Sequence, residues 1–413
     1  MRGFLPCEGM DGHEMVFSEL QIGCSMDSVI IHYQEIALKK RNRPWFIERL
    51  ISNIRIVLCD LDIIKVRALM GRIEIVLGVG ADWSEVQSRL QGVFGIANFA
   101  QARRVSRDFK ELEKSVLEGI PKENVESFRV TARRADKLYS LKSPEIERLL
   151  GARIQKERNW SVDLKNPELT VRVEILNRHA FFMFRQHQGP GGLPSGVSGK
   201  VLCLISGGID SPVAAYRLMK RGCRVRFVHF HSYPLLSHAS IDKVREITEH
   251  LTKYQLSSRV YFVAFSDIQR QIVLSVPSPL RVVLYRRFMM RIATRLARKS
   301  RCGALVTGEA VGQVASQTLE NLGVIGDSVS GLPVLRPLIG LDKDEISSEA
   351  IGIGTYPISI IPDQDCCQLF TPRNPATKAR LKEIESAEQS LPIEGLVEEA
   401  IENVEQEDFS FPK

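Results

Sequence analysis

The pattern of apolar positions changes at the segment QGPGGLPSGVSGK (188–200). Before it, short stretches alternate apolar and polar side chains: Phe128 and Val130 alternate with Arg129 and Thr131 in SFRVTARRADK. Such alternation is typical of a strand with one face buried and the other in water. After it, VLCLI and RVYFVAF are nearly continuous apolar runs separated by helical segments. This order predicts a parallel sheet that is buried on both faces.

These patterns divide the chain of 413 residues into four parts, as expected for a length that exceeds one compact core. Residues 1–27 are an N-terminal extension. Residues 28–79 have a strand–helix–strand pattern, and residues 80–187 form a second, more basic α+β unit. Residues 188–413 begin with a Gly- and Pro-rich linker and continue as an α/β unit. The acidic stretch from Glu383 is expected to form a helical cap and a frayed tail.

Charge and cysteine usage narrow the class of protein. The net charge of +7 is compatible with a polyanionic partner without establishing one. The eight cysteines include no C-x-x-C pair, which disfavours a zinc site or an iron–sulfur cluster. No apolar run reaches the length of a membrane helix, so no membrane partner is expected. Acidic residues in the first 27 positions argue against a transit peptide. We expect a cytoplasmic protein.

The clearest chemical signal is the loop that follows VLCLI. The predicted strand ends at Ile205 and a helix is predicted from Pro212; the loop between them is Ser206, Gly207, Gly208, Ile209, Asp210 and Ser211, the phosphate loop (206–211). Glycines let backbone amides approach an anion, and a helix N-terminus adds unpaired N–H groups. The sequence therefore predicts a phosphate cradle, although it lacks the Gly-Lys-Ser/Thr of a Walker A loop. Asp210 could also cap the helix.

This loop resembles the SGGxDS loop of the ATP pyrophosphatase superfamily, whose members split ATP between the α and β phosphates. The resemblance implies that Ser206, Gly207, Gly208 and Ser211 hold pyrophosphate and that Asp210 serves Mg²⁺ or adenylation. Ligands of open α/β sheets bind at the carboxyl ends of strands. Residues at two such ends are therefore expected to border the nucleotide, although a histidine there is also common in a core: Leu204, Ile205, His229 and Phe230.

Further segments narrow the superfamily to a family. The segments VTGEAVGQVASQTLENL, PVLRPLIGLDKDEI and PDQDCCQLFTPRNPATKAR follow the phosphate loop in order and closely resemble the tRNA 4-thiouridine synthetase family. Upstream, IIHYQEIALKKRNRPWF resembles its ferredoxin-like domain and SFRVTARRADK its RNA-binding THUMP domain. The chain departs from the family at Gln34 and Lys40, where glycines are usual. It resembles the short form, without a rhodanese-like domain. The implied fold is a ferredoxin-like domain, a THUMP domain and a parallel-sheet α/β ATP pyrophosphatase domain.

The resemblance also implies a reaction. ATP, with Mg²⁺, adenylates O4 of a tRNA uridine (position 8), and persulfide sulfur then displaces AMP to give 4-thiouridine. The same sulfur can serve thiamine thiazole synthesis. Lys343 would assist adenylation, Cys366 would be the catalytic cysteine, and Arg286, Gly308 and Gln317 would bind the nucleotide. Implied partners are tRNA, a cysteine desulfurase or other persulfide donor, and a second copy of the chain. A solvated Lys343 and a buried structural pair Cys366–Cys367 are the alternatives from the residues alone.

The predicted RNA contacts lie in the basic second unit. The candidates are Arg129, Arg133, Arg134 and Lys137, because Lys and Arg bind RNA phosphates. A solvated charged strand face is the alternative. For the whole chain, the rival functions are a small-molecule ligase with the same loop, an iron–sulfur tRNA thiolase and a non-catalytic RNA-binding protein.

Overall fold

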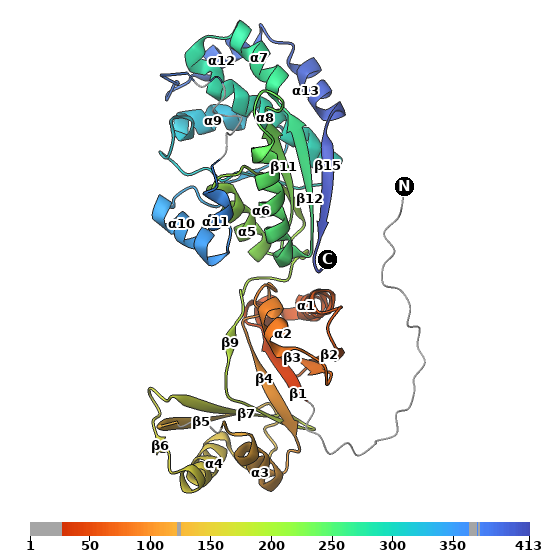
Figure 1. Cartoon of the computed structure of the whole chain (residues 1–413), viewed down its shortest axis with the longest axis vertical. Coiled ribbons are helices and arrows are strands. Elements are labelled where there is room, and N and C mark those ends of the chain that lie inside the picture. Colours follow the sequence, from red (N-terminus) through yellow and green to blue (C-terminus); the bar gives the residue numbers. More distant parts are fainter. Residues whose placement is uncertain (1–26, 122–124, 363–369, 371) are drawn as a thin grey trace, which may run out of the picture.

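The computed structural model describes residues 27–121, 125–362, 370 and 372–413, and arranges them around two sheets (Figure 1). The N-terminal sheet has the order β2-β3-β1-β4-β8-β7-β5-β6, with β9 paired to β4. Its strands are β1 (Asp27–His32), β2 (Ile63–Leu69), β3 (Arg72–Leu77), β4 (Asn98–Val105), β5 (Ser127–Arg134), β6 (Ser161–Val162), β7 (Leu169–Ile175), β8 (Ala180–Met183) and β9 (His187–Gln188). The helices packed against it are η1 (Glu35–Asn42), α1 (Arg43–Val57), α2 (Trp83–Leu90), α3 (Phe109–Gly119) and α4 (Ser143–Arg158).

Strand β4 joins the two halves of this sheet. Its first part pairs antiparallel with β1, from Asn98 opposite His32 to Arg103 opposite Asp27. Its last part pairs with β8, where Arg103 lies opposite Phe182. A single strand is thus shared by the two units that the sequence separates, and the boundary between residues 79 and 80 stays a prediction.

A buried carboxylate also links the two halves. Glu174 on β7 is 5% exposed. Its Oε1 accepts a hydrogen bond of 2.9 Å from His32 Nε2 on β1, and its Oε2 lies 2.6 Å from Arg72 Nη1 on β3. A buried charge is tolerated when it is paired in this way.

The C-terminal sheet has the order β14-β13-β10-β11-β12-β15. Its strands are β10 (Lys200–Leu204), β11 (Arg224–His231), β12 (Ser257–Ala264), β13 (Leu305–Val306), β14 (Val334–Leu335) and β15 (Glu405–Ser410). The first five are parallel, as predicted, and β15 is antiparallel to β12. Its helices are α5 (Asp210–Lys220), α6 (Ala239–Gln255), α7 (Ser266–Ser275), η2 (Ser278–Leu280), α8 (Arg281–Lys299), η3 (Ala315–Gln317), α9 (Leu319–Asp327), α10 (Lys343–Gly352), α11 (Tyr356–Ser359), α12 (Leu381–Glu388) and α13 (Ile393–Glu402).

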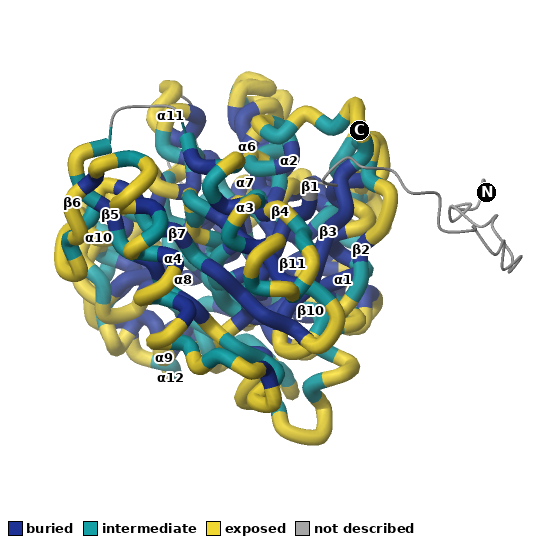
Figure 2. The backbone as a smooth tube through the Cα atoms, turned by 90° about the horizontal axis from the view of Figure 1, so that it is seen from below, coloured by how far each residue is buried: buried dark blue, intermediate teal, exposed yellow. Residues whose placement is uncertain are grey.

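Both faces of this sheet are covered by helices, which explains the continuous apolar runs in its strands. Leu202 packs with Phe288 and Ile292 of α8 on one face. Cys203, the next residue, packs with Val213 of α5 on the other. In Figure 2 the buried segments of the backbone lie toward the interior of the molecule and the exposed ones lie mainly at its periphery. The parallel-sheet α/β architecture predicted for the C-terminal part is thus observed.

The predicted frayed tail is wrong. After α13 the chain forms β15, whose Glu407 and Asp408 form ion pairs with Arg245 on α6 and Arg259 on β12. Polar side chains hold this edge strand, so its sequence carries no apolar alternation that could reveal it.

Two smaller expectations concern the backbone and the membrane. Lys40, one of the two positions where the resemblance led us to expect a glycine, has a φ of 43°, a region that favours glycine. In the described part of the chain, none of the helices has both the length and the apolarity needed to span a bilayer.

Candidate active site

The phosphate loop is braced by two serine side chains. Ser206 N donates a hydrogen bond of 2.9 Å to Ser211 Oγ, and the two hydroxyl oxygens lie 3.2 Å apart. Gly208 N donates to Ser206 Oγ at 3.3 Å. Helix α5 begins at Asp210, two residues before the predicted start at Pro212. Its N-terminus therefore lies within the loop, where its amides and dipole favour an anion.

Asp210 does not cap the helix, so that alternative for its side chain is wrong. The N-cap residue is Ile209, and no side chain bonds to the first turn. Instead, Asp210 Oδ1 accepts a hydrogen bond of 2.7 Å from Lys343 Nζ, and Oδ2 accepts one of 2.9 Å from Gln313 Nε2. Lys343 is the first residue of α10, whose start is fixed by a capping box between Asp342 and Glu345. The fold thus joins two residues that were predicted to be catalytic.

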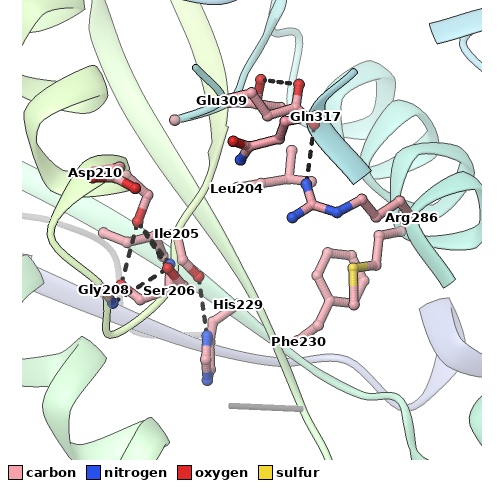
Figure 3. A pocket seen from close by; sticks show the side chains of 14 residues that line it. Leu204, Ile205, Ser206, Gly208, Asp210, His229, Phe230, Arg286, Glu309 and Gln317 are labelled. Atoms are coloured by element: carbon pink, nitrogen blue, oxygen red, sulfur yellow. Dashed lines mark hydrogen bonds and ion pairs between the residues drawn. The ribbon is translucent and has the colours of Figure 1, made fainter. Parts of the chain in front are cut away.

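A cavity opens at the carboxyl ends of β10, β11 and β13 (Figure 3). It is lined by Leu204, Ile205, Ser206, Gly208, Asp210, Ser211, His229, Phe230, Arg286, Met289, Thr307, Gly308, Glu309 and Gln317. The structure therefore gathers every predicted nucleotide-binding residue except Gly207, which lies in the loop but does not line the cavity. Their role in binding stays a prediction.

Gly308 lets two loops meet at the floor of this cavity. A Cβ atom on Gly308 would lie 2.8 Å from the backbone nitrogen of Ser211 and 2.9 Å from the carbonyl carbon of Asp210. Both are backbone atoms of the first turn of α5, which cannot move without changing the phosphate loop. Glycine at this position is therefore required by packing, in addition to the nucleotide role implied by the resemblance.

Two histidines stand at the end of β11. His229 is 2% exposed, and its Nδ1 lies 3.0 Å from the carbonyl oxygen of Ile205. It thus ties the ends of β10 and β11 together while its ring lines the cavity. Burial, together with the charges of His229 and His238, lowers the pKa of His231 to about 4. His231 is therefore neutral at physiological pH.

The sequence did not single out Glu309 or Thr307. Glu309 is 4% exposed and accepts hydrogen bonds from Arg286 (3.0 Å), Arg336 (2.8 Å) and Thr307 (2.9 Å). This carboxylate holds the Arg286 side chain at the cavity (Figure 3). The only available signal was its place next to Gly308, since its two arginines lie far away in the chain.

Cys366 and Cys367 lie outside the described residues, but the chain on both sides of residues 363–369 approaches the cavity. On one side, Ser359 Oγ donates a hydrogen bond of 3.3 Å to the carbonyl oxygen of Gly208. On the other, Thr318, the residue after Gln317, donates to the carbonyl oxygen of Thr377 at 2.6 Å.

The four predicted RNA contacts differ in their surroundings. Arg133 and Lys137 are exposed. Arg134 Nη1 donates to the carbonyl oxygens of Tyr139 (3.1 Å) and Leu141 (3.0 Å), and Arg129 donates to that of Leu164 at 3.3 Å. Arg129 and Arg134 thus hold neighbouring loops, whereas Arg133 and Lys137 are available to a ligand.

Comparison with known proteins identifies the family. A protein described as "Probable tRNA sulfurtransferase" from Thermus thermophilus is 45% identical over 383 residues, covering 92% of this chain and 93% of that protein. The chain belongs to the tRNA sulfurtransferase family. A relative of the same description from Brevibacillus brevis is 41% identical, and the match covers 93% of this chain and 96% of that protein.

Family models and solved structures agree with the predicted architecture. The model "Thiamine biosynthesis protein (ThiI)" matches residues 196–393, the "ThiI ferredoxin-like domain" residues 28–100 and the "THUMP domain" residues 106–184. A structure titled "Crystal structure of a 4-thiouridine synthetase - RNA complex with bound ATP" has a TM-score of 0.85 and 38% identity, covering 93% of this chain and 100% of that one. The structure of PH1313 from Pyrococcus horikoshii matches with a TM-score of 0.63 and 26% identity, and the match covers 80% of this chain and 100% of that one. The predicted family and fold class are confirmed.

Proposed function

We propose that this protein is an ATP-dependent tRNA uridine 4-sulfurtransferase. The observation that carries the proposal is the cavity in which the phosphate loop, the Asp210–Lys343 pair and the end of β11 meet. It occurs in a chain that is 38% identical to a 4-thiouridine synthetase solved with RNA and bound ATP.

ATP binding follows from the phosphate loop. Backbone amides at Gly208 and the start of α5 present partial positive charge, and Arg286 adds a cation on the facing wall. We place the triphosphate on this loop and the nucleoside toward His229, Phe230 and Gln317. Gln317 is 7% exposed and lines the cavity.

Mg²⁺ fits the residues present. Mg²⁺ is commonly held by one or two carboxylates together with substrate phosphates. Asp210 offers one carboxylate beside the loop, and Glu309 is occupied by arginines. Within the described residues no cluster of three metal-ligating side chains exists, so the remaining ligands would be phosphate and water oxygens. When bound, the ion would neutralise charge that develops on the phosphates.

The first stage is adenylation. Uridine O4 attacks the α-phosphorus while the N3 proton passes to solvent, the bond from that phosphorus to the bridging oxygen breaks, and pyrophosphate leaves. Lys343 exchanges its contact with Asp210 for a phosphate oxygen and stabilises the departing charge. Adenylation is needed because O4 of uridine is a poor leaving group until it carries a phosphoryl group.

The second stage is sulfur transfer through Cys366. The terminal sulfur of a persulfide attacks C4, the C4–O4 bond breaks, and AMP leaves with its electron pair. Cys366 either carries this sulfur or attacks the persulfide donor. When Cys366 carries it, a second thiol cleaves the remaining S–S bond, and an external reductant reopens the resulting disulfide. Ser359, which precedes Cys366 by seven residues, donates a hydrogen bond to the carbonyl oxygen of Gly208 in the phosphate loop.

Several finer assignments rest on the family resemblance. These are the cysteine desulfurase as sulfur donor, a homodimer, uridine 8 as target, the cytoplasmic location, a supply of sulfur to thiazole synthesis, and domain limits at residues 28–79, 80–187 and 188–413. The matched THUMP model over residues 106–184 disfavours a small-molecule ligase, which has no use for an RNA-binding unit.

Reconstitution tests the proposal. The protein is incubated with unmodified tRNA, ATP, Mg²⁺, a cysteine desulfurase and cysteine, and the nucleosides of the digested tRNA are then separated. We expect 4-thiouridine only when all components are present. ATP consumption with an amidated small molecule and no thiolated nucleoside would favour the ligase instead.

A further inference from the structure

A second cavity lies at the amino-terminal end of the C-terminal sheet, opposite the nucleotide cavity. Four cationic side chains and one carboxylate line it: Lys200, Arg224, Arg226, Arg259 and Asp408. The catalytic scheme above uses none of these residues.

The parallel register gathers these cations from three strands. Lys200 at the start of β10 pairs with Arg224 at the start of β11, and Leu202 pairs with Arg226. On the next strand, Arg259 of β12 lies opposite Asp408 of β15. Since alternate residues of a strand share a face, Arg224 and Arg226 project from the same side of the sheet. The result is a row of positive charge across the sheet edge.

Acidic side chains compensate little of this charge. Asp408 is engaged by Arg259 through two contacts of 2.6 Å. Arg226 Nη1 donates to the hydroxyl of Tyr261 at 3.2 Å. In the described ranges the structure records no ion pair for Lys200, Arg224 or Arg226. Neighbouring like charges destabilise a sheet unless a counter-charge is present.

The charged residues around Arg224, which lies in the middle of this row, affect its pKa. Partial burial lowers the pKa of the Arg224 guanidinium, and the positive charges of Arg49 and Arg226 lower it further. The Arg224 side chain also lies close to the linker backbone. Gly196 has a φ of +90°, and a Cβ there would lie 3.1 Å from Arg224 Nε.

The positive row extends toward the N-terminal half of the protein. Arg49, which acts on Arg224, belongs to α1. Figure 1 shows the end of the C-terminal sheet where β12 begins directed toward α1 and α2. Cations from two parts of the chain therefore converge across the linker, an arrangement suited to an extended polyanion.

We propose that Lys200, Arg224 and Arg226 bind phosphate groups of the RNA backbone, as a contact surface on the catalytic unit apart from the predicted one on β5. Arginine forks match phosphate oxygens, and lysine adds a point charge. The inference rests on the proposed function, which supplies RNA as a ligand. A free oligophosphate offers the same chemistry, so the test separates these two sources.

The test measures tRNA affinity at several salt concentrations for the wild type and the double variant Arg224→Ala/Arg226→Ala. Loss of two phosphate contacts should reduce the slope of log K against log salt by about 1.4 to 1.8. The charge-conserving double variant Arg224→Lys/Arg226→Lys should keep most of the slope. The matched control is Arg295→Ala, which removes an arginine of α8 that is already paired with Glu394 and Glu398 of α13, and it should leave the slope unchanged.

The outcomes are separable. A wild type that binds no tRNA contradicts the proposed function and this inference together. A wild type that binds tRNA, with an unchanged slope in the alanine double variant, overturns only the inference. Calorimetry with pyrophosphate supplies the second arm: pyrophosphate binding that the double variant loses, while its tRNA slope is unchanged, would assign the cavity to a free oligophosphate.

Discussion

Lys343 and Asp210 form an ion pair of 2.7 Å between the first turns of α10 and α5, although they lie 133 residues apart in the chain. The lysine side chain is 49% exposed and the aspartate side chain 22%. A pair this exposed contributes at most about 1 kcal/mol to folding. The pair therefore adds little to stability, and its position beside the phosphate loop agrees with the role proposed for it in adenylation.

Lys343→Ala should lower the rate of tRNA-dependent pyrophosphate release about 10²-fold, because one cation that stabilises the departing phosphates is lost. The melting temperature should change little. The matched control is Lys382→Ala, which removes an exposed lysine of α12 and should leave the rate unchanged. A normal rate in Lys343→Ala would remove the lysine from the adenylation step.

Gly308→Ala should weaken ATP binding, because its Cβ would meet the backbone of Ser211 at 2.8 Å and displace the phosphate loop. We expect a rise of about tenfold or more in the KM for ATP, the equivalent of roughly 1.4 kcal/mol. Gly323→Ala is the matched control, since a Cβ there meets nothing within 4 Å. In helix α9 that change should be neutral or stabilise the protein by about 1 kcal/mol. Equal KM values for both variants would contradict the packing argument.

Glu174→Gln should destabilise the N-terminal sheet by about 2 kcal/mol, because the carboxylate that binds His32 and Arg72 loses its charge. Urea unfolding at neutral pH measures this loss. Glu118→Gln, at an exposed position on α3, should have little effect. An equally small effect at both positions would show that the buried network adds no net stability.

The stability difference between the wild type and Glu174→Gln should depend on pH. Burial alone would raise the pKa of Glu174, but the hydrogen bond from His32 and the charges of His32, Arg72 and Arg133 hold it below its ordinary value of 4.5. A carboxyl with a lowered folded pKa stabilises the protein above its unfolded pKa and loses that contribution as pH falls through the folded value. The stability difference between wild type and Glu174→Gln should therefore shrink below about pH 4.5. A difference that grows on acidification would contradict the assignment.

Arg133→Ala should weaken tRNA binding and reduce its salt slope by about 0.7 to 0.9, the effect of one lost phosphate contact. Arg134→Ala should instead lower thermal stability, because Arg134 holds the carbonyl oxygens of Tyr139 and Leu141. Salt-dependent filter binding and thermal melts separate the two effects. A salt slope that changes in Arg134→Ala but not in Arg133→Ala would contradict this assignment of the RNA contact.

The sequence predicted the parts of the fold that local pattern determines. Continuous apolar runs indicated β10 and β12, and alternation around Phe128 and Val130 indicated β5. The strand β15 was missed because its partners are charged: Asp408 depends on Arg259, which lies 149 residues away. No local pattern can encode such a pairing.

The candidate site shows the same division. Residues in the phosphate loop, such as Ser206 and Gly208, could be found because the strand–loop–helix motif that binds phosphate occupies consecutive residues. Glu309 could not, because its function depends on Arg286 and Arg336 from other elements. The start of α5 was misplaced by two residues, since Pro212 fits the first helical turn without having to begin it.

In the proposed reaction, one cavity activates uridine with ATP and Cys366 then supplies the sulfur. Cys366→Ala separates the two stages, so pyrophosphate and 4-thiouridine should be quantified in the same reaction with tRNA, ATP, Mg²⁺ and a persulfide donor. The wild type should release about one pyrophosphate for each 4-thiouridine formed, as the two-stage scheme requires. Cys366→Ala should still release pyrophosphate in a tRNA-dependent manner and form no 4-thiouridine. Normal thiolation by Cys366→Ala, or thiolation by the wild type without pyrophosphate release, would contradict the account.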